Sequence, residues 1–444
     1  MPMETLLSLH GKRILALNPP VEDFAFFDLW SKPLGILYLL ERMRKNGNSV
    51  SFIDCIHEGA VGKKTFGREK IAAAEIAKPE VYCGIKRNYH RFGLTREGIC
   101  ARLTAMESPD IIFVTSMMTY WYGGVKWLIR LLHAEMPGVP VVLGGVYARL
   151  CPEHAASIGA DYIVKENWEP DVSYPAMDLY GTLPYGVTMT SFGCPLSCEY
   201  CASHLLWPRY RRRPLTEVLA EVDFQANLGA VDFAFYDDAL LIDKEKYFYP
   251  MCEALRHRYG GKLRLHTPNG LHVRQIDEKC ALMMKESGLE TIRLSLESID
   301  PKLSQTSSGK VAREEYARAV KNLRASGYSR ADCETYILLG LPNQSLDSVK
   351  ETINFVGDAG GKAKLAEFSP IPGTKSFAEA VKKLPRLAEE PLLQNNSVYS
   401  SWISGEISPE ALQELKDLAR ATAAPKNGYG ADREDLDEKE NNGN

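Results

Sequence analysis

The sequence predicts an α/β protein in which a doubly wound N-terminal domain precedes a second parallel sheet and a short helical tail. Short apolar segments alternate with helical segments between residues 13 and 164, and the alternation resumes near residue 186 after an irregular stretch. Such alternation is typical of parallel sheets covered by helices. The hydrophobic content of 45% over 444 residues is that of a globular protein with a sizeable core.

The N-terminal domain is expected to be Rossmann-like and to span residues 1–165. Its strands are predicted at 13–17, 50–54, 111–115, 141–144 and 161–164, and its helices at 33–45, 124–136 and 152–158. Ligands of doubly wound sheets bind at the carboxyl ends of the strands. The polar stretch 58–96 does not fit the alternation, and we interpret it as an insertion that forms a lid or a partner surface.

Residues 166–185 are irregular and are interpreted as a linker to a second domain at 186–385. The strands of this domain are predicted at 186–191, 232–237, 263–268, 291–296, 334–339 and 364–369, and the helices at 215–228, 244–258, 277–287, 312–326 and 346–358. Six strand–helix units are fewer than the eight of a full barrel, but barrel chemistry is again expected at the carboxyl ends of the strands.

The C-terminal segment 386–424 is predicted to contain one clear helix over 408–422. Ser408 is a good N-cap and Pro409 suits the first helical position. Residues 425–444 are polar, acidic and rich in Gly and Asn, and they are expected to be disordered.

Three cysteines with the spacing C-x3-C-x2-C, at Cys194, Cys198 and Cys201, form the most specific motif of the chain. Three thiolates on one short loop can hold three irons of a [4Fe–4S] cluster and leave the fourth iron open to a ligand. The alternatives are three buried thiols or part of a zinc site. A zinc site normally requires a fourth Cys or His at a compatible spacing, and only His204 is close by.

The cysteine motif follows the apolar segment Gly186–Thr190, and Tyr200 precedes the third cysteine. This combination resembles the signature of the radical S-adenosylmethionine (SAM) superfamily, and the resemblance covers about residues 180–385. It implies a partial (β/α)6 TIM-like barrel whose [4Fe–4S] cluster binds SAM at the open iron. It also implies reductive cleavage of SAM to a 5′-deoxyadenosyl radical, with an electron donor such as flavodoxin or ferredoxin.

The resemblance also indicates which strand ends contact SAM. Tyr200 and the acidic pair Asp237 and Asp238 would lie near the SAM amino group, although an acidic pair at this place can also cap a helix. Asn269 would also contact SAM. Ser295, Glu297 and Arg293 would contact its ribose and carboxylate, with an internal Arg–Glu ion pair as the alternative for Arg293. Gly340, in Leu339-Gly-Leu-Pro342, would lie against the adenine. For His266 and His272 a structural role is favoured over a substrate contact.

A doubly wound domain before such a barrel resembles the cobalamin-binding branch of the superfamily. The resemblance implies a cobalamin site at the strand ends that carry Thr115, Ser116 and Met117, and Gly144 and Gly145. The Asp-x-His-x-x-Gly motif is absent and residues 18–30 contain no His, so no protein His is expected to ligate cobalt. The alternative is a vestigial domain that only braces the barrel.

The resulting hypothesis is a cobalamin-dependent radical SAM C-methyltransferase whose substrate the sequence does not identify. The alternatives are a cobalamin-free or non-methylating enzyme that performs cyclisation or rearrangement, and a non-catalytic iron–sulfur or cobalamin-binding protein. A methylthiotransferase would need three further N-terminal cysteines, but Cys55, Cys83 and Cys100 are widely spaced.

Charge and hydropathy limit the partners and the location. The net charge of −4 and the pI near 6.2 do not favour nucleic acid. Neither a signal peptide nor a membrane-spanning apolar stretch is recognised, so a cytoplasmic location is expected.

Overall fold

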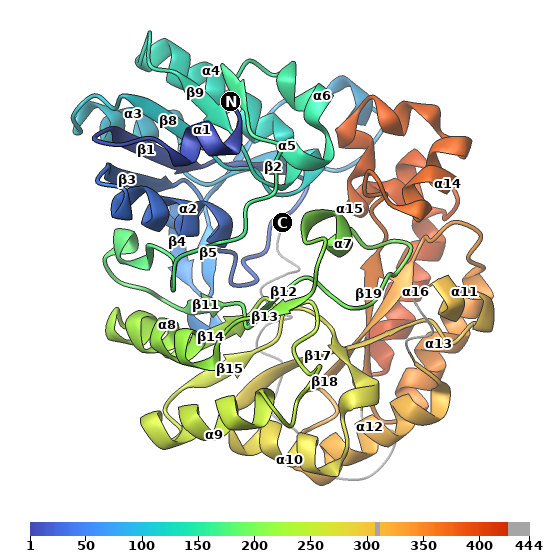
Figure 1. The fold of residues 1–444 in the computed structure, drawn as a ribbon. Coiled ribbons are helices and arrows are strands. Elements are labelled where there is room, and N and C mark those ends of the chain that lie inside the picture. Colours follow the sequence, from blue (N-terminus) through green and yellow to red (C-terminus); the bar gives the residue numbers. More distant parts are fainter. Residues whose placement is uncertain (307–310, 425–444) are drawn as a thin grey trace.

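The computed structural model describes residues 1–306 and 311–424 and contains two parallel sheets, each packed against helices (Figure 1). The N-terminal sheet lies at the upper left of Figure 1 and the second sheet curves through the lower half. The α/β fold class predicted from the sequence is confirmed. The stretch 425–444, for which disorder is expected, lies outside the described residues.

The N-terminal sheet has five parallel strands in the order β10-β9-β8-β1-β3. This is the doubly wound order with a switch point between β1 and β8, where ligands of such sheets bind. Successive residues of β1 enter different cores, since Ile14 and Ala16 face one helical layer and Leu15 and Leu17 face the other. The strands are β1 (Arg13–Asn18), β3 (Ser49–Asp54), β8 (Ile111–Val114), β9 (Val141–Leu143) and β10 (Tyr162–Ile163).

Helices cover both faces of this sheet, as burial on both faces of a parallel sheet requires. The helix α2 covers one face through Leu37, Leu40 and Met43, while α3 and α4 cover the other. The helices of the domain are α1 (Met3–Leu7), α2 (Leu34–Lys45), α3 (Arg96–Thr104), α4 (Tyr122–Glu135), α5 (Val146–Leu150) and α6 (Pro152–Ala156).

The stretch 58–96 forms small antiparallel sheets outside the parallel one. The strands β4 (Ala60–Lys63) and β5 (Glu69–Ile71) form a hairpin. The strand β7 (His90–Phe92) pairs on one side with β6 (Ala73–Glu75) and on the other with β2 (Val21–Asp23). This stretch also packs on the C-terminal segment. The Tyr82 hydroxyl donates to the carbonyl oxygen of Leu392 (2.6 Å), and the Arg87 guanidinium donates to that of Ser397 (3.0 Å).

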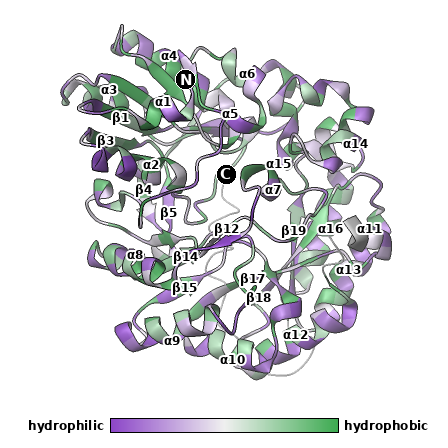
Figure 2. Ribbon diagram, viewed as in Figure 1, coloured by the Kyte–Doolittle hydropathy of each residue, from purple (hydrophilic) through white to green (hydrophobic). Residues whose placement is uncertain are grey.

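The second sheet has six parallel strands in sequential order, β11-β14-β15-β17-β18-β19, and a short β16 that pairs with β17. Amphipathic helices surround it, and the helices α9, α10 and α12 in Figure 2 show hydrophobic and hydrophilic residues side by side. The strands are β11 (Gly186–Thr188), β14 (Asp232–Phe235), β15 (Arg264–His266), β16 (Leu271–His272), β17 (Leu289–Glu297), β18 (Cys333–Leu339) and β19 (Lys362–Glu367). The helices are α7 (Ser203–Leu206), α8 (Leu215–Asn227), α9 (Phe248–Tyr259), α10 (Glu278–Glu286), α11 (Pro301–Thr306), α12 (Arg313–Ala325) and α13 (Leu346–Asp358).

The chain after β19 forms α14 (Lys375–Lys383), α15 (Asn396–Val398), a π-helix at Tyr399–Ile403, and α16 (Pro409–Ala421). The Ser408 side chain caps α16 by accepting from the Ala411 amide (3.1 Å). Leu412, Leu415 and Ala419 of α16 are buried in the main core. The helix packs against β19 and α13, so it acts as the helical cover of the last strand.

In the part of the chain that the structure describes, no helix combines the length and apolar character needed to cross a bilayer.

Candidate functional site

The cysteine loop is closed at its base by two short strands. β12 (Ser191–Phe192) pairs antiparallel with β13 (Arg211–Arg212) and joins the two ends of the loop. Gly193 has a φ of +75°, and a Cβ there would lie 3.1 Å from the Arg209 carbonyl oxygen. The rings of Phe192 and Trp207 pack at 4.7 Å between centroids. The loop is therefore held at both ends.

Two of the three thiol groups accept backbone hydrogen bonds. The Leu196 amide donates to Cys194 Sγ (3.5 Å) and the Ser203 amide donates to Cys201 Sγ (3.4 Å). The Cys201 amide also donates to the Cys198 carbonyl oxygen (3.1 Å). N–H bonds to sulfur favour the thiolate, which is the form that binds iron. The three cysteines are thus suited to bind three different irons of one cluster.

Other cysteines are in a different environment. Burial raises the pKa of Cys252, Cys280 and Cys333 to about 12, so these side chains remain neutral thiols. Within the described residues 1–306 and 311–424, no group of three or more His, Cys, Asp or Glu side chains is arranged to hold a single metal ion.

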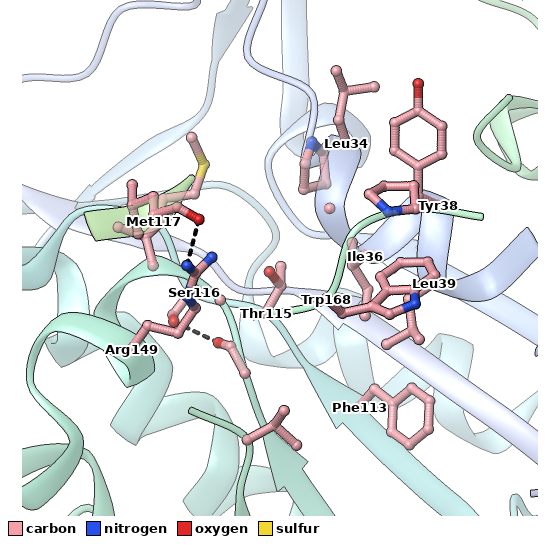
Figure 3. A pocket seen from close by; sticks show the side chains of 18 of the residues that line it. Leu34, Ile36, Tyr38, Leu39, Phe113, Thr115, Ser116, Met117, Arg149 and Trp168 are labelled. Carbon is pink, nitrogen blue, oxygen red and sulfur yellow. Dashed lines mark hydrogen bonds between the residues drawn. The ribbon is translucent and has the colours of Figure 1, made fainter. Parts of the chain in front are cut away.

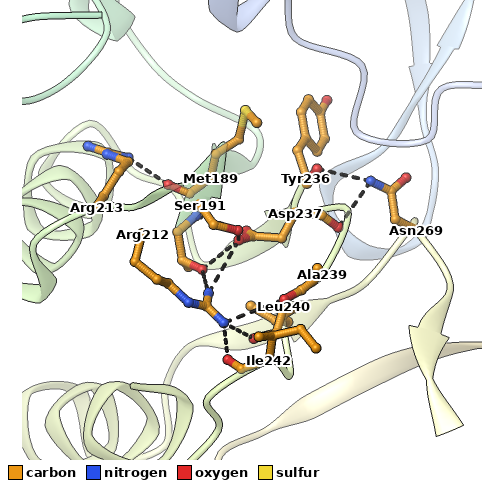
Figure 4. A network of polar contacts seen from close by, with 11 residues as sticks. Met189, Ser191, Arg212, Arg213, Tyr236, Asp237, Ala239, Leu240, Ile242 and Asn269 are labelled. Carbon is orange, nitrogen blue, oxygen red and sulfur yellow. Dashed lines mark hydrogen bonds and ion pairs between the residues drawn. The ribbon is translucent and has the colours of Figure 1, made fainter. Parts of the chain in front are cut away.

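The two acidic residues after β14 have different surroundings, and Figure 4 shows the contacts of the first one, Asp237. Asp237 is buried and accepts from the Thr190 amide (2.8 Å), Thr190 Oγ1 (2.5 Å) and Ser191 Oγ (2.6 Å). Arg212 lies 3.7 Å from the same carboxylate. Burial raises the pKa of Asp237, and these hydrogen bonds oppose the shift. The side chain therefore ties the end of β14 to the end of β11.

Asp238 is only partly buried and lies on the side of the cysteine loop. Its Oδ2 accepts from Ser203 Oγ (2.5 Å) at the start of α7. Of the two carboxylates proposed from the sequence to contact SAM, Asp238 is thus the one with exposed surface.

Substitutions at the two positions are expected to have different effects. Asp237→Asn should lower the free energy of unfolding by about 2 kcal/mol, because it disturbs a buried, fully bonded group. Asp238→Asn should change stability by less than about 0.5 kcal/mol but weaken SAM binding about tenfold. Urea unfolding and equilibrium SAM binding measure these effects. The assignment of SAM contact to Asp238 and of a structural role to Asp237 would be wrong in either of two cases. The first is an unchanged SAM affinity in Asp238→Asn, and the second is a weakened SAM affinity with full stability in Asp237→Asn.

Further polar residues converge at the ends of β14, β15 and β17. Asn269 donates through Nδ2 to the carbonyl oxygens of Tyr236 (2.9 Å) and Asp237 (3.3 Å). A Cβ at Gly270 would lie 2.1 Å from Ser295 Oγ, so only glycine allows this approach. Asn269 and Ser295 are thus held beside the acidic pair.

Glu297 ends β17 in a strained conformation. Its φ is +68°, and the pairing of β17 with β18 shifts register between Ser295 and Glu297. Positive φ in a residue other than glycine costs energy and is concentrated at functional sites. Burial and then the charge of Glu297 raise the pKa of Tyr200, which places Glu297 next to the cysteine loop.

Arg293 and Gly340 take part in interactions within the protein. Arg293 pairs with Glu334 (2.8 Å between Nε and Oε2), which also faces Lys364 (3.1 Å) and Lys362 (3.4 Å). Burial opposes ionisation of Glu334, but these cations outweigh it and lower its pKa. The geometry therefore favours the internal ion pair that was the alternative for Arg293. The Gly340 amide donates to Gln344 Oε1 (2.8 Å), and a Cβ at Gly340 would lie 1.9 Å from Ser400 Oγ.

A cavity of about 330 Å³ lies between the two domains (Figure 3). The residues proposed from the sequence for cobalamin, namely Thr115, Ser116, Met117, Gly144 and Gly145, all line it. In Figure 3, Ile36, Leu39, Phe113 and Trp168 form an apolar side opposite Ser116, Met117 and Arg149. The barrel contributes Met189, Phe192, Leu206, Trp207 and Tyr236. The cavity thus joins the strand ends of the first domain to the residues on both sides of the cysteine loop.

The two glycines at this cavity differ in function. A Cβ at Gly144 would meet only Val164 Cβ, at 3.9 Å, so its missing side chain leaves room inside the cavity. A Cβ at Gly145, which has a φ of +93°, would lie 2.3 Å from the Ser116 carbonyl oxygen. Gly144 therefore provides space for a ligand, while Gly145 is required by the chain itself.

Gly145→Ala is expected to lower the free energy of unfolding by about 2–3 kcal/mol, because it adds both backbone strain and a clash with Ser116. Urea unfolding of the protein measures this loss. A stability within about 0.5 kcal/mol of the parent protein would contradict it.

His266 has a structural role. Its Nε2 is 3.0 Å from Asp232 Oδ1, its Nδ1 is 3.0 Å from Thr291 Oγ1, and its ring stacks on Trp30 at 4.5 Å. His266 thus joins the loop after β2 to the barrel, which is a structural role of the kind favoured from the sequence. His272 lies in β16 and is partly exposed.

Contacts between the domains involve residues that the sequence analysis did not single out. Asp23 is buried and accepts from Asn395 Nδ2 (3.0 Å) and Trp121 Nε1 (2.7 Å). The Tyr122 hydroxyl donates to Glu390 (2.9 Å). The residues in these contacts are 98 to 372 positions apart in the chain, so no local pattern reveals them. Lys32 Nζ is buried 4.1 Å from the Tyr180 ring centroid and lacks a hydrogen-bond partner in the described residues.

The fold and site define a two-domain α/β protein in which a doubly wound domain faces a cysteine triad at the top of a six-stranded half-barrel. Residues 188–356 match the family model of the radical SAM superfamily, and residues 72–170 match that of the B12 binding domain. The chain therefore contains the two domains that are combined in the cobalamin-binding branch of the radical SAM superfamily, as the resemblance implied.

Curated relatives agree with this assignment. An uncharacterized methyltransferase of Pyrococcus horikoshii is 27% identical over 217 residues, which are 48% of this chain and 46% of the relative. The anaerobic magnesium-protoporphyrin IX monomethyl ester cyclase of Rubrivivax gelatinosus is 25% identical over 43% of this chain and 34% of the relative. The matches thus span about half or less of the length of these relatives.

Solved structures show the same two-domain fold. The radical SAM methyltransferase TsrM from Kitasatospora setae, with cobalamin and a [4Fe-4S] cluster bound, superposes with a TM-score of 0.60 at 15% identity. The match covers 85% of this chain and 78% of that chain. The cobalamin-dependent SAM radical enzyme OxsB gives a TM-score of 0.53 at 14% identity, over 86% of this chain and 56% of that chain.

Proposed function

We propose that this protein is a cobalamin-dependent radical SAM enzyme that methylates a carbon atom of its substrate. The observation that carries the proposal is the shared cavity between the domains. Its walls come from the ends of β8 and β9 on one side and from Phe192, Leu206 and Trp207 beside the cysteine loop on the other. A ligand in the cavity would thus lie next to the cluster.

The residues divide among three groups. Cys194, Cys198 and Cys201 would hold the cluster, and Tyr200, Asp238, Asn269, Ser295 and Glu297 would surround SAM. Thr115, Ser116, Met117, Gly144 and Gly145 would hold cobalamin. When bound, these groups supply the electron and the SAM-derived 5′-deoxyadenosyl radical for hydrogen abstraction, and the carrier for the methyl group.

The protein's own contribution is positioning and exclusion of water. Leu34, Ile36, Phe113, Val142 and Trp168 give the interdomain cavity an apolar lining, which disfavours water there. The β12–β13 pair holds the cysteine loop, and the Asp237 contacts hold the adjoining strand ends. A fixed and dehydrated site orients the reactants and protects radical intermediates from water.

The methylthiotransferase alternative is less consistent with the cysteine environments. Cys55 is buried, and burial raises its pKa well above the usual value. Cys83 is exposed in the 58–96 stretch, and Cys100 lies on α3. These positions are on separate elements, so they do not support a second cluster.

Iron and cobalt analysis of protein produced anaerobically with cobalamin tests the proposal. We expect about four irons and one cobalt per chain. After chemical reduction with SAM labelled in its methyl group, 5′-deoxyadenosine should form. Iron without cobalt would remove the cobalamin part of the proposal. Deoxyadenosine formation with cobalt bound but without methyl transfer to any candidate substrate would favour cyclisation or rearrangement instead.

A further inference from the structure

The strand β18 directs polar and charged side chains toward the inside of the half-barrel. Thr335 Oγ1 is hydrogen-bonded to the Tyr316 hydroxyl on α12 (2.7 Å), and Ile337 lies in the main core, so both face the helices outside the sheet in Figure 1. Because successive side chains of a strand alternate between its faces, Glu334 and Tyr336 point inward. Tyr336 is partly exposed, whereas Thr335 and Ile337 are buried. Solvent therefore reaches the inside of the half-barrel at this level.

Two cations share one oxygen of the inward-facing Glu334 carboxylate. Arg293 Nε on β17 lies 2.8 Å from Glu334 Oε2, and Lys364 Nζ on β19 lies 3.1 Å from the same atom. Lys362 lies 3.4 Å from the other oxygen, Oε1. In the part of the chain that the structure describes, no second acidic side chain is at ion-pair distance from Arg293 or Lys364. The Lys364 side chain is 42% exposed, against 11% for Glu334, so part of it is accessible to a ligand.

Lys364 lies in the same row of the sheet as Ser295, which is one of the residues proposed to surround SAM. Lys364 is opposite Tyr336 in the pairing of β19 with β18, and Tyr336 is opposite Ser295 in the pairing of β18 with β17. Neighbouring strands are about 4.8 Å apart, so the backbones of Lys364 and Ser295 are about 10 Å apart. The Tyr336 hydroxyl donates to the Pro268 carbonyl oxygen (3.1 Å), which fixes the tyrosine ring in this row. A molecule held at Lys364 would thus lie beside SAM.

We propose that Lys364 binds the carboxylate of an acidic small-molecule substrate inside the half-barrel, while Arg293 and Glu334 position its ammonium group. The inference rests on the proposed function and gives a chemical class to the substrate that this function leaves open. Together the three side chains carry one net positive charge, which suits a singly charged carboxylate better than a doubly charged phosphate. Pairing at a partly buried site is also less screened by salt than pairing at the surface. The bound substrate would present to SAM a carbon several bonds from its acidic group.

Binding of benzoate to the reconstituted holoenzyme tests this site, with benzamide as the neutral counterpart and phenyl phosphate as the other common kind of anion. Ligand-observed NMR gives the Kd of each compound. Lys364→Met removes the charge and keeps most of the side-chain volume, whereas Lys364→Arg retains the charge. Lys321→Met is the matched control, because Lys321 is exposed on α12, outside the sheet. Iron content and SAM affinity are measured for the parent protein and every variant.

We expect the parent protein to bind benzoate at least about tenfold more tightly than benzamide, and more tightly than phenyl phosphate. The Kd for benzoate should rise about tenfold in Lys364→Met, return close to the parent value in Lys364→Arg and remain unchanged in Lys321→Met. Iron content and SAM affinity should be the same in all four proteins.

Equal binding of benzoate and benzamide by the parent protein would overturn the inference, whether or not Lys364→Met folds. An unchanged Kd for benzoate in Lys364→Met would also overturn it, as would tighter binding of phenyl phosphate than of benzoate. Weaker SAM binding in Lys364→Met would assign Lys364 to the carboxylate of SAM instead of the substrate. Absence of SAM cleavage by the reduced parent protein would overturn the proposed function itself.

Discussion

Replacing Cys201 by alanine is expected to remove the bound iron and to lower SAM cleavage at least about a thousandfold, because an iron of the cluster loses its thiolate. The Ser203 amide that donates to Cys201 Sγ would lose its acceptor, but this bond lies in a loop and not in the core. The fold should therefore persist. Iron analysis, the visible absorption of the cluster and the yield of 5′-deoxyadenosine measure the effect.

Cys252→Ala is the control for this experiment. Cys252 is buried in α9, and its raised pKa keeps it a neutral thiol that cannot compete for iron. We expect full iron content with a loss of about 1 kcal/mol in stability from the small cavity. If Cys201→Ala retained four irons, or if Cys252→Ala lost them, the assignment of the triad as cluster ligands would be wrong.

Replacing Gly144 by leucine is expected to exclude cobalamin while leaving the cluster intact. The new Cβ would meet Val164 Cβ at 3.9 Å, and the rest of the leucine side chain would occupy part of the cavity that Gly144 lines. Cobalt should fall from about one per chain to below about a tenth, since overfilling a packed ligand site costs several kcal/mol. Iron content and deoxyadenosine formation should be retained, and methyl transfer should be lost.

Gly84→Leu provides the matched comparison for Gly144→Leu. Gly84 is exposed in the 58–96 stretch and has open space around its Cβ direction, so the same change there leaves the cavity untouched. Cobalt binding equal to that of the parent protein is expected. Retention of cobalt by Gly144→Leu would show that the interdomain cavity does not hold the cofactor.

Local patterns predict those parts of the protein that depend on local sequence. The apolar runs of β1, β8 and β9 predict the strands because a parallel sheet is buried on both faces. The turn residues after such strands must then share one edge of the sheet, and Ser116 and Gly144 indeed line the same cavity. Their contact with cobalamin remains a prediction. The cysteine motif is recognisable for the same reason, since its ligands lie within one loop.

Roles that depend on distant partners could not be predicted in this way. Asp237 and Asp238 are adjacent and chemically identical, and only the positions of Thr190, Ser191 and Ser203 separate an anchoring carboxylate from an accessible one. Arg293 finds Glu334 on the next strand rather than a ligand. The bond from Asn395 to Asp23 joins residues 372 positions apart, which no periodicity or motif encodes.

The position of α16 limits how far the chain can be shortened. It also determines when the last strand of the barrel can be covered during synthesis. β19 receives its helical cover from α16, and the Ala363 amide of β19 donates to Thr422 Oγ1 (2.8 Å), just after that helix. A fragment that stops at residue 385 would contain every barrel strand and yet leave the outer face of the last one uncovered. During synthesis the residues up to Thr422 must therefore leave the ribosome before β19 receives its helical cover, and until then this last strand is open to aggregation.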